Sequence, residues 1–370
     1  MNWRQTLMVL RRMDWSMVLG IAVLLFAGVM FIFSASVRGE DFSASSFYEK
    51  QLGWIAIGAI CYLMLVLVDY HRLRDASWWL YGISIVLLIL VLLMGKKVYG
   101  AYRWLNLFGI QVQPSELAKV ATMLALARFW GRPGRDPSEP RAILATFAIV
   151  VLPAALILKE PDLGTAAVLL PLAFIMMFAA GVPLRSLGLL ILIGLLLAPF
   201  SWFFLGDYQK ERILVFLDPG RDPLGAGWNK IQSEIAVGSG GLWGKGYLNG
   251  TQNVLGFLPR TVAPTDFIYS VIAEETGFMG SMGLLGLYTL VLLGGIRTAV
   301  SSRDKLGRMM AVGVTGLLFC HTFVNIAMTI GLLPITGIPL PLISYGGSFM
   351  ISTMTGLGIV QSVYVRRNRR

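Results

Sequence analysis

The chain has 370 residues, of which 56% are hydrophobic and only 14% are charged, and its mean hydropathy is +0.71. Soluble domains carry roughly 25% charged residues, so the composition argues strongly against a soluble α/β protein. The formal net charge of +11 does not indicate a nucleic-acid partner. Cytoplasmic loops of membrane proteins collect Lys and Arg, and no long basic run here contains interleaved aromatic residues.

Ten apolar segments predict transmembrane helices, because a helix needs about 20 largely apolar residues to cross a bilayer. They fall near 15–35, 52–69, 78–94, 114–130, 141–158, 163–180, 184–205, 266–296, 309–332 and 342–365. The first is longer than a signal-peptide core and more spans follow, so it is expected to be retained. The eighth is long enough to include a membrane-proximal extension. The fold class is therefore an all-α polytopic membrane protein in a single transmembrane domain, 1–370.

Two features outside the spans carry further expectations. Residues 98–113 are apolar but too short and too polar to span, so they are expected at the membrane interface. The long loop 206–265, between the seventh and eighth spans, is rich in Gly and Trp and contains the amphipathic piece 208–212. Loops of this length are usually functional or disordered.

Lys and Arg are in excess on the N-terminal side of the first span and in the alternate loops, which predicts cytoplasmic termini and an extracytoplasmic long loop.

The numbers and positions of cysteine and histidine argue against a disulfide framework and against a structural zinc site. Cys61 and Cys320 fall inside apolar segments, and the chain has two histidines. Separate thiols do not make a disulfide framework, and a structural zinc site is not expected without clustered Cys and His.

Charged residues in or beside the spans are the best candidates for function, because they are costly in a bilayer. Glu116 and Lys119 are three residues apart at the start of the fourth span, so they share a helix face and can pair. Such a pair can also do no more than neutralise itself.

Two further carboxylates lie where helices begin. Asp162 follows Glu160 in a short outer turn, and Asp266 opens the eighth span, with Glu274 and Glu275 deeper in it. Helix N-capping explains either aspartate, and for Asp266 the residue pattern alone favours it. Capping by Asp162 does not exclude a cavity that holds a cation.

The start of the last span is rich in small polar residues, Ser344 to Ser348. Small residues allow helix packing or close approach of a ligand. His321 and Asn325 are one turn apart on the same predicted helix. Their side chains are expected to form hydrogen bonds to other helices. Together these patterns predict an outward-opening polar cavity with cations and carboxylates, and they do not separate a transporter from an enzyme.

The same residues resemble the SEDS family (shape, elongation, division and sporulation), from Phe47 to Gly358. The matching strings, in order, are Arg103-Trp104, Gln113-Pro114-Ser115-Glu116 with Lys119, Pro161-Asp162-Leu163-Gly164-Thr165, Leu217-Asp218-Pro219, Asp222-Pro223-Leu224-Gly225-Ala226-Gly227, Ser239-Gly240-Gly241 with Gly244-Lys245-Gly246, Thr265-Asp266-Phe267 and Ser344-Tyr345-Gly346-Gly347-Ser348. Gly250-Thr251-Gln252 resembles the rod-shape branch, RodA, more than the division branch, FtsW. One departure is Lys50, where relatives often have Arg before Gln51; it keeps the charge but loses bidentate phosphate recognition.

The resemblance implies a peptidoglycan glycosyltransferase of cell elongation. It would polymerise lipid II, an undecaprenyl-diphosphate-linked disaccharide pentapeptide, into β-1,4 glycan strands at the outer face of the bacterial inner membrane. It also implies an activating partner, a single-span class B penicillin-binding protein that supplies transpeptidation, and other membrane proteins of the elongasome.

The resemblance also implies roles for particular residues. Asp266 matches the family's essential loop aspartate and would be the catalytic base. Glu116 would orient Lys119, and Asp162 would support the site, with a divalent cation (Mg or Mn) near it; no organic cofactor is expected. The residues expected to bind the substrate are Lys50, Arg103, Lys119, Lys245, Arg260, Ser344 and Ser348.

Two other functions remain open at this point. A lipid II flippase or other transporter fits the intramembrane charges equally well, although the inverted repeats with broken helices typical of transporters are not evident. A non-catalytic scaffold of the wall-synthesis complex is the second alternative.

Overall fold

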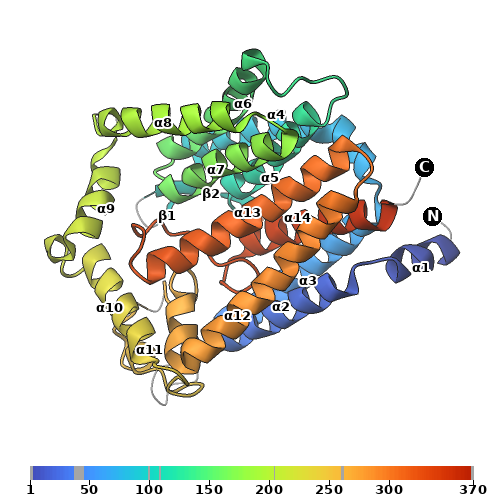
Figure 1. The fold of residues 1–370 in the computed structure, drawn as a ribbon. Helices are drawn as coiled ribbons and strands as arrows, with labels where there is room; N and C mark the ends of the chain where they lie inside the picture. Colours follow the sequence, from blue (N-terminus) through green and yellow to red (C-terminus); the bar gives the residue numbers. More distant parts are fainter. Residues whose placement is uncertain are drawn as a thin grey trace.

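The computed structural model describes residues 3–36, 46–98, 101–107, 110–203, 205–259 and 262–367. Every predicted span corresponds to a helix (Figure 1). These helices are α2 (Trp15–Ser36), α3 (Ser46–Leu67), α4 (Tyr70–Met94), α5 (Pro114–Trp130), α6 (Pro140–Lys159), α7 (Leu163–Ala180), α8 (Leu184–Ser201), α12 (Ile268–Ser301), α13 (Lys305–Thr329) and α14 (Gly347–Arg366). A short helix, α1 (Trp3–Arg11), precedes them.

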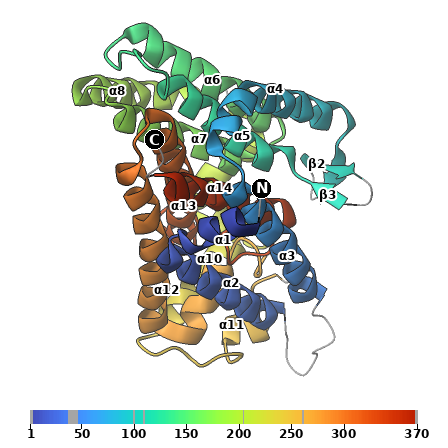
Figure 2. The same ribbon diagram turned by 90° about the vertical axis from the view of Figure 1, so that its right-hand side faces the viewer.

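Most of these helices meet the length and apolarity that a bilayer requires. Within the described residues, eight are long and apolar enough to cross a membrane; the apolar part of α8, 184–200, is slightly shorter, and α5 has 17 residues. The predicted class, a polytopic helical membrane protein, is confirmed. Both ribbon views place α8 on the opposite side of the bundle from α2 (Figures 1 and 2), and most of its side chains are exposed, as expected for a helix that faces lipid.

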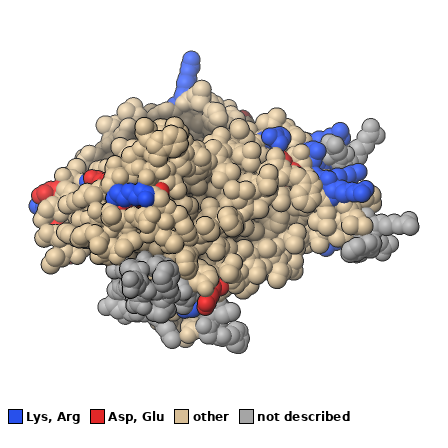
Figure 3. All heavy atoms as spheres, turned by 90° about the horizontal axis from the view of Figure 1, so that it is seen from below, with Lys and Arg blue, Asp and Glu red and all other residues tan. Residues whose placement is uncertain are grey.

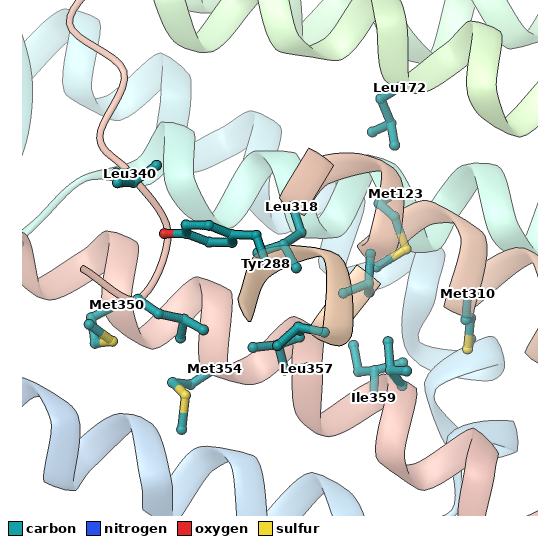
Figure 4. Close-up of a cluster of buried hydrophobic side chains, with 14 of the residues drawn as sticks. Met123, Leu172, Tyr288, Met310, Leu318, Leu340, Met350, Met354, Leu357 and Ile359 are labelled. Carbon is teal, nitrogen blue, oxygen red and sulfur yellow. The ribbon is translucent and has the colours of Figure 1, made fainter. Parts of the chain in front are cut away.

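The core lies where α5, α7, α12, α13 and α14 meet. Leucine and methionine side chains fill it (Figure 4), including Met123, Leu172 and Met310, each with 0% exposure. Tyr288 of α12 is also buried, and its hydroxyl donates to the carbonyl oxygen of Pro341 at 2.5 Å. This bond satisfies the one polar atom of the ring, and it ties α12 to the segment that leads into α14.

Three short strands were not predicted. β1 (Lys96–Val98), β2 (Ala101–Leu107) and β3 (Ile110–Val112) form an antiparallel sheet in the order β1-β2-β3, between α4 and α5. The sequence predicted an interfacial segment here and gave no secondary structure for it. The segment is too short for a spanning helix, and strand pairing satisfies its backbone groups within the protein. The sheet matters because β2 carries Arg103.

The long loop is ordered rather than extended. It contains α9 (Asp207–Leu217), a 3-10 turn (Pro219–Arg221), α10 (Ala226–Ser239) and α11 (Thr251–Val254). Figure 1 shows these helices at the end of the bundle away from both termini. Local caps explain two of the starts: Asp218 accepts from the amide of Gly220 at 3.2 Å, and Asp222 accepts from that of Ala226 at 2.6 Å.

Charge is unevenly distributed along the molecule. On the face in Figure 3, Lys and Arg gather at the end that carries the termini, acidic and basic side chains mix at the other end, and the middle is almost free of charge. An uncharged belt between two charged ends is the pattern expected of a membrane-embedded bundle.

Candidate functional site

Asp266 lies in the turn that leads into α12. Its amide donates to the carbonyl oxygen of Val262 at 3.0 Å, and its own carbonyl oxygen accepts from the side-chain amide of Asn325 in α13 at 2.9 Å. The side chain is half-buried. Within the described ranges its carboxyl oxygens accept no hydrogen bond, so the backbone is fixed while the carboxylate remains available for a proton.

Three charged residues act on this carboxylate. Burial raises the pKa of Asp266 to about 6; Arg212 opposes this shift, Asp162 adds to it and Arg103 opposes it. Four segments that are remote in sequence therefore converge here: β2, the turn between α6 and α7, α9 and the start of α12. A carboxylate that titrates close to neutral pH is suited to general base chemistry.

Arg103 fixes the turn between α6 and α7. Its guanidinium donates to the carbonyl oxygen of Glu160 at 3.1 Å and also to that of Pro161. The planar fork of arginine suits two such contacts. Arg103 therefore orients the backbone that carries Asp162, in addition to its electrostatic effect on Asp266.

Asp162 caps α7, as its position predicted. It accepts from the amide of Thr165 at 3.2 Å and from its hydroxyl at 2.9 Å. The side-chain amide of Gln113 donates to Asp162 at 3.1 Å, and the amide of Gln113 donates to the hydroxyl of Ser348 at 3.0 Å. Ser348 is thus joined to Asp162 through Gln113, a residue to which the sequence analysis gave no role of its own.

Arg212 was also missed as a site residue. It lies in α9, where its guanidinium donates to the carbonyl oxygen of Ile335 and to the hydroxyl of Tyr208, and it stacks 4.7 Å from the centre of the Tyr208 ring. The amphipathic piece 208–212 drew attention to the segment but could not show that the charge of Arg212 acts on Asp266.

Ser344 supports the site from the backbone side. It is fully buried, its hydroxyl donates to the carbonyl oxygen of Thr265 at 2.5 Å and accepts from the amide of Leu340 at 2.7 Å. Gln51 is also fully buried and donates to the carbonyl oxygen of Ser344 at 3.2 Å. Lys50 is the next residue of α3 before Gln51, and it is exposed.

Glu116 and Lys119 form the predicted pair, 2.9 Å apart and 3% exposed on each side. Lys119 also lies 2.8 Å from Nε2 of His321 in α13, and Ser352 donates to Glu116 at 3.1 Å. The contact with His321 confirms the expected hydrogen bond between helices. These polar groups line a small cavity of about 40 Å³ together with Phe349.

Two cationic candidates remain, Lys245 and Arg260. Lys245 pairs with Glu274 of α12 at 2.7 Å, and Arg260 lies outside the described residues. Neither Lys119 nor Lys245 is among the charges that act on Asp266. The structure therefore gathers Arg103, Asp162, Asp266 and Arg212 at one centre and puts Lys119 in a separate buried cluster.

Glu160 is a buried carboxyl beside this centre. It has 0% exposure, and neither of its oxygens has a hydrogen-bond partner among the described residues. Burial raises its pKa to about 8; Asp162 adds to the shift and Arg103 opposes it. Burial therefore favours the neutral, protonated form of Glu160 at pH 7.

A divalent cation fits this centre only with oxygens supplied by a substrate. Among the described residues, no three His, Cys, Asp or Glu side chains gather as a ligand set. Asp162 already accepts three hydrogen bonds of roughly four that a carboxylate can take. Mg²⁺ is commonly held by one or two carboxylates together with phosphate oxygens and water, so the donors present suit an ion that arrives with a diphosphate.

Comparison with known proteins shows which family the chain belongs to. Residues 14–369 match the family model FTSW_RODA_SPOVE, described as cell cycle protein. The chain is 41% identical over 356 residues to the peptidoglycan glycosyltransferase MrdB of Escherichia coli K12, covering 96% of this chain and 94% of that protein. It resembles a chain of a solved peptidoglycan synthase complex that coordinates polymerization and crosslinking, with a TM-score of 0.81 and 32% identity over 97% of this chain and 99% of that one.

A second solved structure gives the same result. The rod shape determining protein RodA of Thermus thermophilus is 30% identical with a TM-score of 0.72, over 97% of this chain and 98% of that one. Both family match and identity extend over almost the whole length, which confirms the resemblance to the SEDS family. The chain belongs to the FtsW/RodA/SpoVE family of cell cycle proteins.

Proposed function

We propose that this chain is a peptidoglycan glycosyltransferase that polymerises lipid II into β-1,4 glycan strands during cell elongation. The activity class rests on the relatives named for it. The observation that carries the mechanism is a single half-buried carboxylate, Asp266, whose pKa is raised to about 6 and which stands among Arg103, Arg212 and Asp162. One base surrounded by positive charge is what sugar transfer from a diphosphate donor requires.

The reaction needs one proton acceptor and no separate acid. A carboxyl oxygen of Asp266 takes the proton of the acceptor 4-hydroxyl while the oxygen of that hydroxyl forms a bond to C1 of the donor sugar. The bond between C1 and the phosphate oxygen breaks, and its electron pair leaves with undecaprenyl diphosphate. The diphosphate is a weak base, so the second carboxyl group of a glycosidase is unnecessary. Direct displacement at an α-linked donor gives the β-linked product.

Positive charge stabilises the departing diphosphate. Arg103 and Arg212 are the two guanidinium groups that lower the pKa of Asp266. Preorganised cations of this kind stabilise developing negative charge. Lys50, which is exposed, and Lys119 in its buried pocket extend the positive path along the substrate, and Arg260 belongs to the same proposal. Glu116 orients Lys119, while Ser344 and Ser348 hold the backbone around the two aspartates.

A divalent cation, Mg²⁺ or Mn²⁺, is proposed as an addition brought with the diphosphate. Asp162 would hold it together with phosphate oxygens, and the ion would supply charge neutralisation. The check is polymerisation after chelation and readdition of each metal. Parental activity in chelator would remove the cation from this proposal.

The charge pattern and the relatives support the proposed placement in the cell. The chain is a multi-pass membrane protein. We place its termini and basic end in the cytoplasm of the bacterium and the loop 206–265, with Asp266, on the outer side of the inner membrane. A class B penicillin-binding protein is the proposed activating partner, because one structural relative is part of a complex that couples polymerization to crosslinking. Other elongasome membrane proteins belong to the same assembly.

The deciding experiment is glycan synthesis by the purified full-length chain with its partner in lipid vesicles. Glycan ladders on a gel are expected from the parental chain and none from Asp266→Asn. Movement of lipid II across the vesicle membrane without glycan would favour the flippase. Normal growth of cells that carry Asp266→Asn would favour the scaffold.

A further inference from the structure

The helix that follows Asp266 is broken near its start. Gly277 interrupts α12 with φ 67° and ψ −163°, so the helix consists of a short first segment, 268–276, and a long second segment, 278–301. A Cβ atom at Gly277 would lie 2.3 Å from the amide nitrogen of Gly244, so only glycine fits. Asp266 directly precedes the first segment, and its place therefore depends on how that segment is held.

The glycine-rich stretch 240–246 closes the break. Backbone groups freed inside a membrane must find partners within the protein, and this stretch supplies them. The hydrogen bonds run from the amide of Phe278 to the carbonyl oxygen of Gly241 at 2.8 Å, Met279 to Leu242 at 3.1 Å, Lys245 to Glu274 at 3.0 Å and Gly246 to Glu275 at 3.0 Å.

Two glycines allow the backbones to approach this closely. A Cβ on Gly240 would lie 2.1 Å from the carbonyl oxygen of Ala273, and one on Gly244 would lie 2.1 Å from that of Glu275. Both neighbours are backbone atoms, which cannot swing aside as a side chain can. The backbone of the stretch 240–246 therefore packs closely against the backbone of the first segment of α12.

Lys245 adds a charge pair to this backbone contact. Its ammonium group lies 2.7 Å from a carboxyl oxygen of Glu274, and the Glu274 side chain has 0% exposure. The same oxygen accepts from the hydroxyl of Thr251 and the amide of Gln252, each at 3.0 Å. A buried carboxylate that loses its partner is strongly destabilised, so Lys245 fixes where Glu274 and its helical segment rest.

The part of the loop that follows the stretch 240–246 forms hydrogen bonds to α2. The hydroxyl of Tyr247 donates to the carbonyl oxygen of Met30 at 2.8 Å, and the side-chain amide of Asn253 donates to that of Ser34 at 2.7 Å. The hydroxyl of Ser34 in turn donates to Glu275. The first segment of α12 is therefore held between the loop and α2 and has little freedom to shift.

We propose that Lys245 is a positioning residue: its ion pair with Glu274 sets the first segment of α12, and through it the carboxylate of Asp266. On this assignment Lys245 does not bind the substrate diphosphate. The effect on catalysis rests on the proposed function, whereas the effect on the helical segment can be measured without it.

The test compares Lys245→Met with Lys245→Met/Glu274→Gln, in full-length protein with its partner and lipid II. The single variant leaves a buried carboxylate unpaired. Its kcat is expected to fall about ten- to hundredfold, because small displacements of a reacting group cost up to about 10²-fold, while its KM for lipid II stays near the parental value. The double variant has no unpaired charge and is expected to regain most of the kcat. A double variant as inactive as the single one, or a raised KM in both, would overturn the proposal in favour of substrate contact.

Hydrogen–deuterium exchange supplies a readout that does not need glycan synthesis. Amides 262–276 are expected to exchange faster in Lys245→Met and at the parental rate in the double variant. Unchanged exchange in the single variant also overturns the proposal, whether or not the chain polymerises lipid II. Lys230→Met is the matched control, because Lys230 pairs with Glu234 at 3.1 Å on α10 of the same loop and forms no ion pair with a described residue of the first segment; both readouts should stay parental.

Discussion

The side-chain amide of Asn325 holds the backbone of Asp266 from the opposite helix. Its nitrogen donates to the carbonyl oxygen of Asp266 at 2.9 Å and to that of Ile338 at 2.7 Å. One residue of α13 therefore fixes both the turn before α12 and the segment before α14. The proposed base owes its position to a contact that leaves its carboxylate free.

Asn325→Ala should weaken the enzyme without removing any group that meets the substrate. Two carbonyl oxygens would lose their partner, which costs about 1–3 kcal/mol when they stay buried. We expect a lower thermal midpoint and a lower kcat with little change in KM, measured on glycan synthesis. Asn106→Ala, an exposed position on β2, is the control. An unchanged kcat in a destabilised Asn325→Ala would show that the turn holds Asp266 by itself.

The spans could be predicted because apolar length alone identifies a transmembrane helix. The strands could not, since residues 98–113 have no length or period that separates a short sheet from an interfacial coil. The break in α12 was visible only as an overlong apolar segment. Gly277 looks like many other glycines in the sequence, and its conformation depends on contact with the remote stretch 240–246.

The residues of the candidate site also differ in whether the sequence could reveal them. Asp162 could be predicted as a helix cap because it stands at a helix start, where local sequence is informative. Asp266 entered the site through the family resemblance, and the capping role that its position favoured is wrong, because α12 has no side-chain cap. Arg212 could not be predicted as a site residue, because its effect on Asp266 depends on where α9 lies relative to the start of α12. Lys245 was expected at the substrate for its charge, but nothing local indicates that Glu274, 29 residues later, takes that charge.

The activity should fall in acid with an apparent pKa of about 6. The base form of Asp266 is required, burial raises its pKa to about 6, and protonation below that value removes the base. Glycan synthesis measured against pH should therefore be level above the pKa and decline below it. A profile with no decline across this range would argue against Asp266 as the proton acceptor.

Arg212 and Asp162 should shift the acid limb of the pH profile, which is the decline of activity at low pH, in opposite directions. Arg212 lowers the pKa of Asp266 and Asp162 raises it. Arg212→Met should therefore shift the limb to higher pH, and Asp162→Asn should shift it to lower pH, whatever the change in maximal rate. Shifts of the same sign in both variants would contradict the arrangement of charges around Asp266.

The pair of Glu116 and Lys119 can be tested for a role beyond its own neutralisation. Removing one partner leaves a buried charge and costs about 3–5 kcal/mol, so single variants are uninformative. Glu116→Gln/Lys119→Met removes both charges and should keep the fold. We expect this double variant to have a raised KM for lipid II, because we propose that Lys119 contributes to diphosphate binding. A folded double variant with parental KM and kcat would mean that the pair is purely structural.

Glu160 gives the chain a stability that depends on pH. Burial raises its pKa from 4.5 to about 8, so the folded chain keeps a proton that the unfolded chain releases. The stabilising effect is full below 4.5 and is lost as the pH rises to about 8. Glu160→Gln is neutral at every pH and retains the shape of the side chain. Its thermal midpoint should therefore vary less between these two pH values than that of the parental chain, and it should be at least as stable at pH 8. Glu211→Gln, at an exposed position on α9, should follow the parental curve. Parallel curves for Glu160→Gln and the parental chain would mean that Glu160 is ionised in the folded protein.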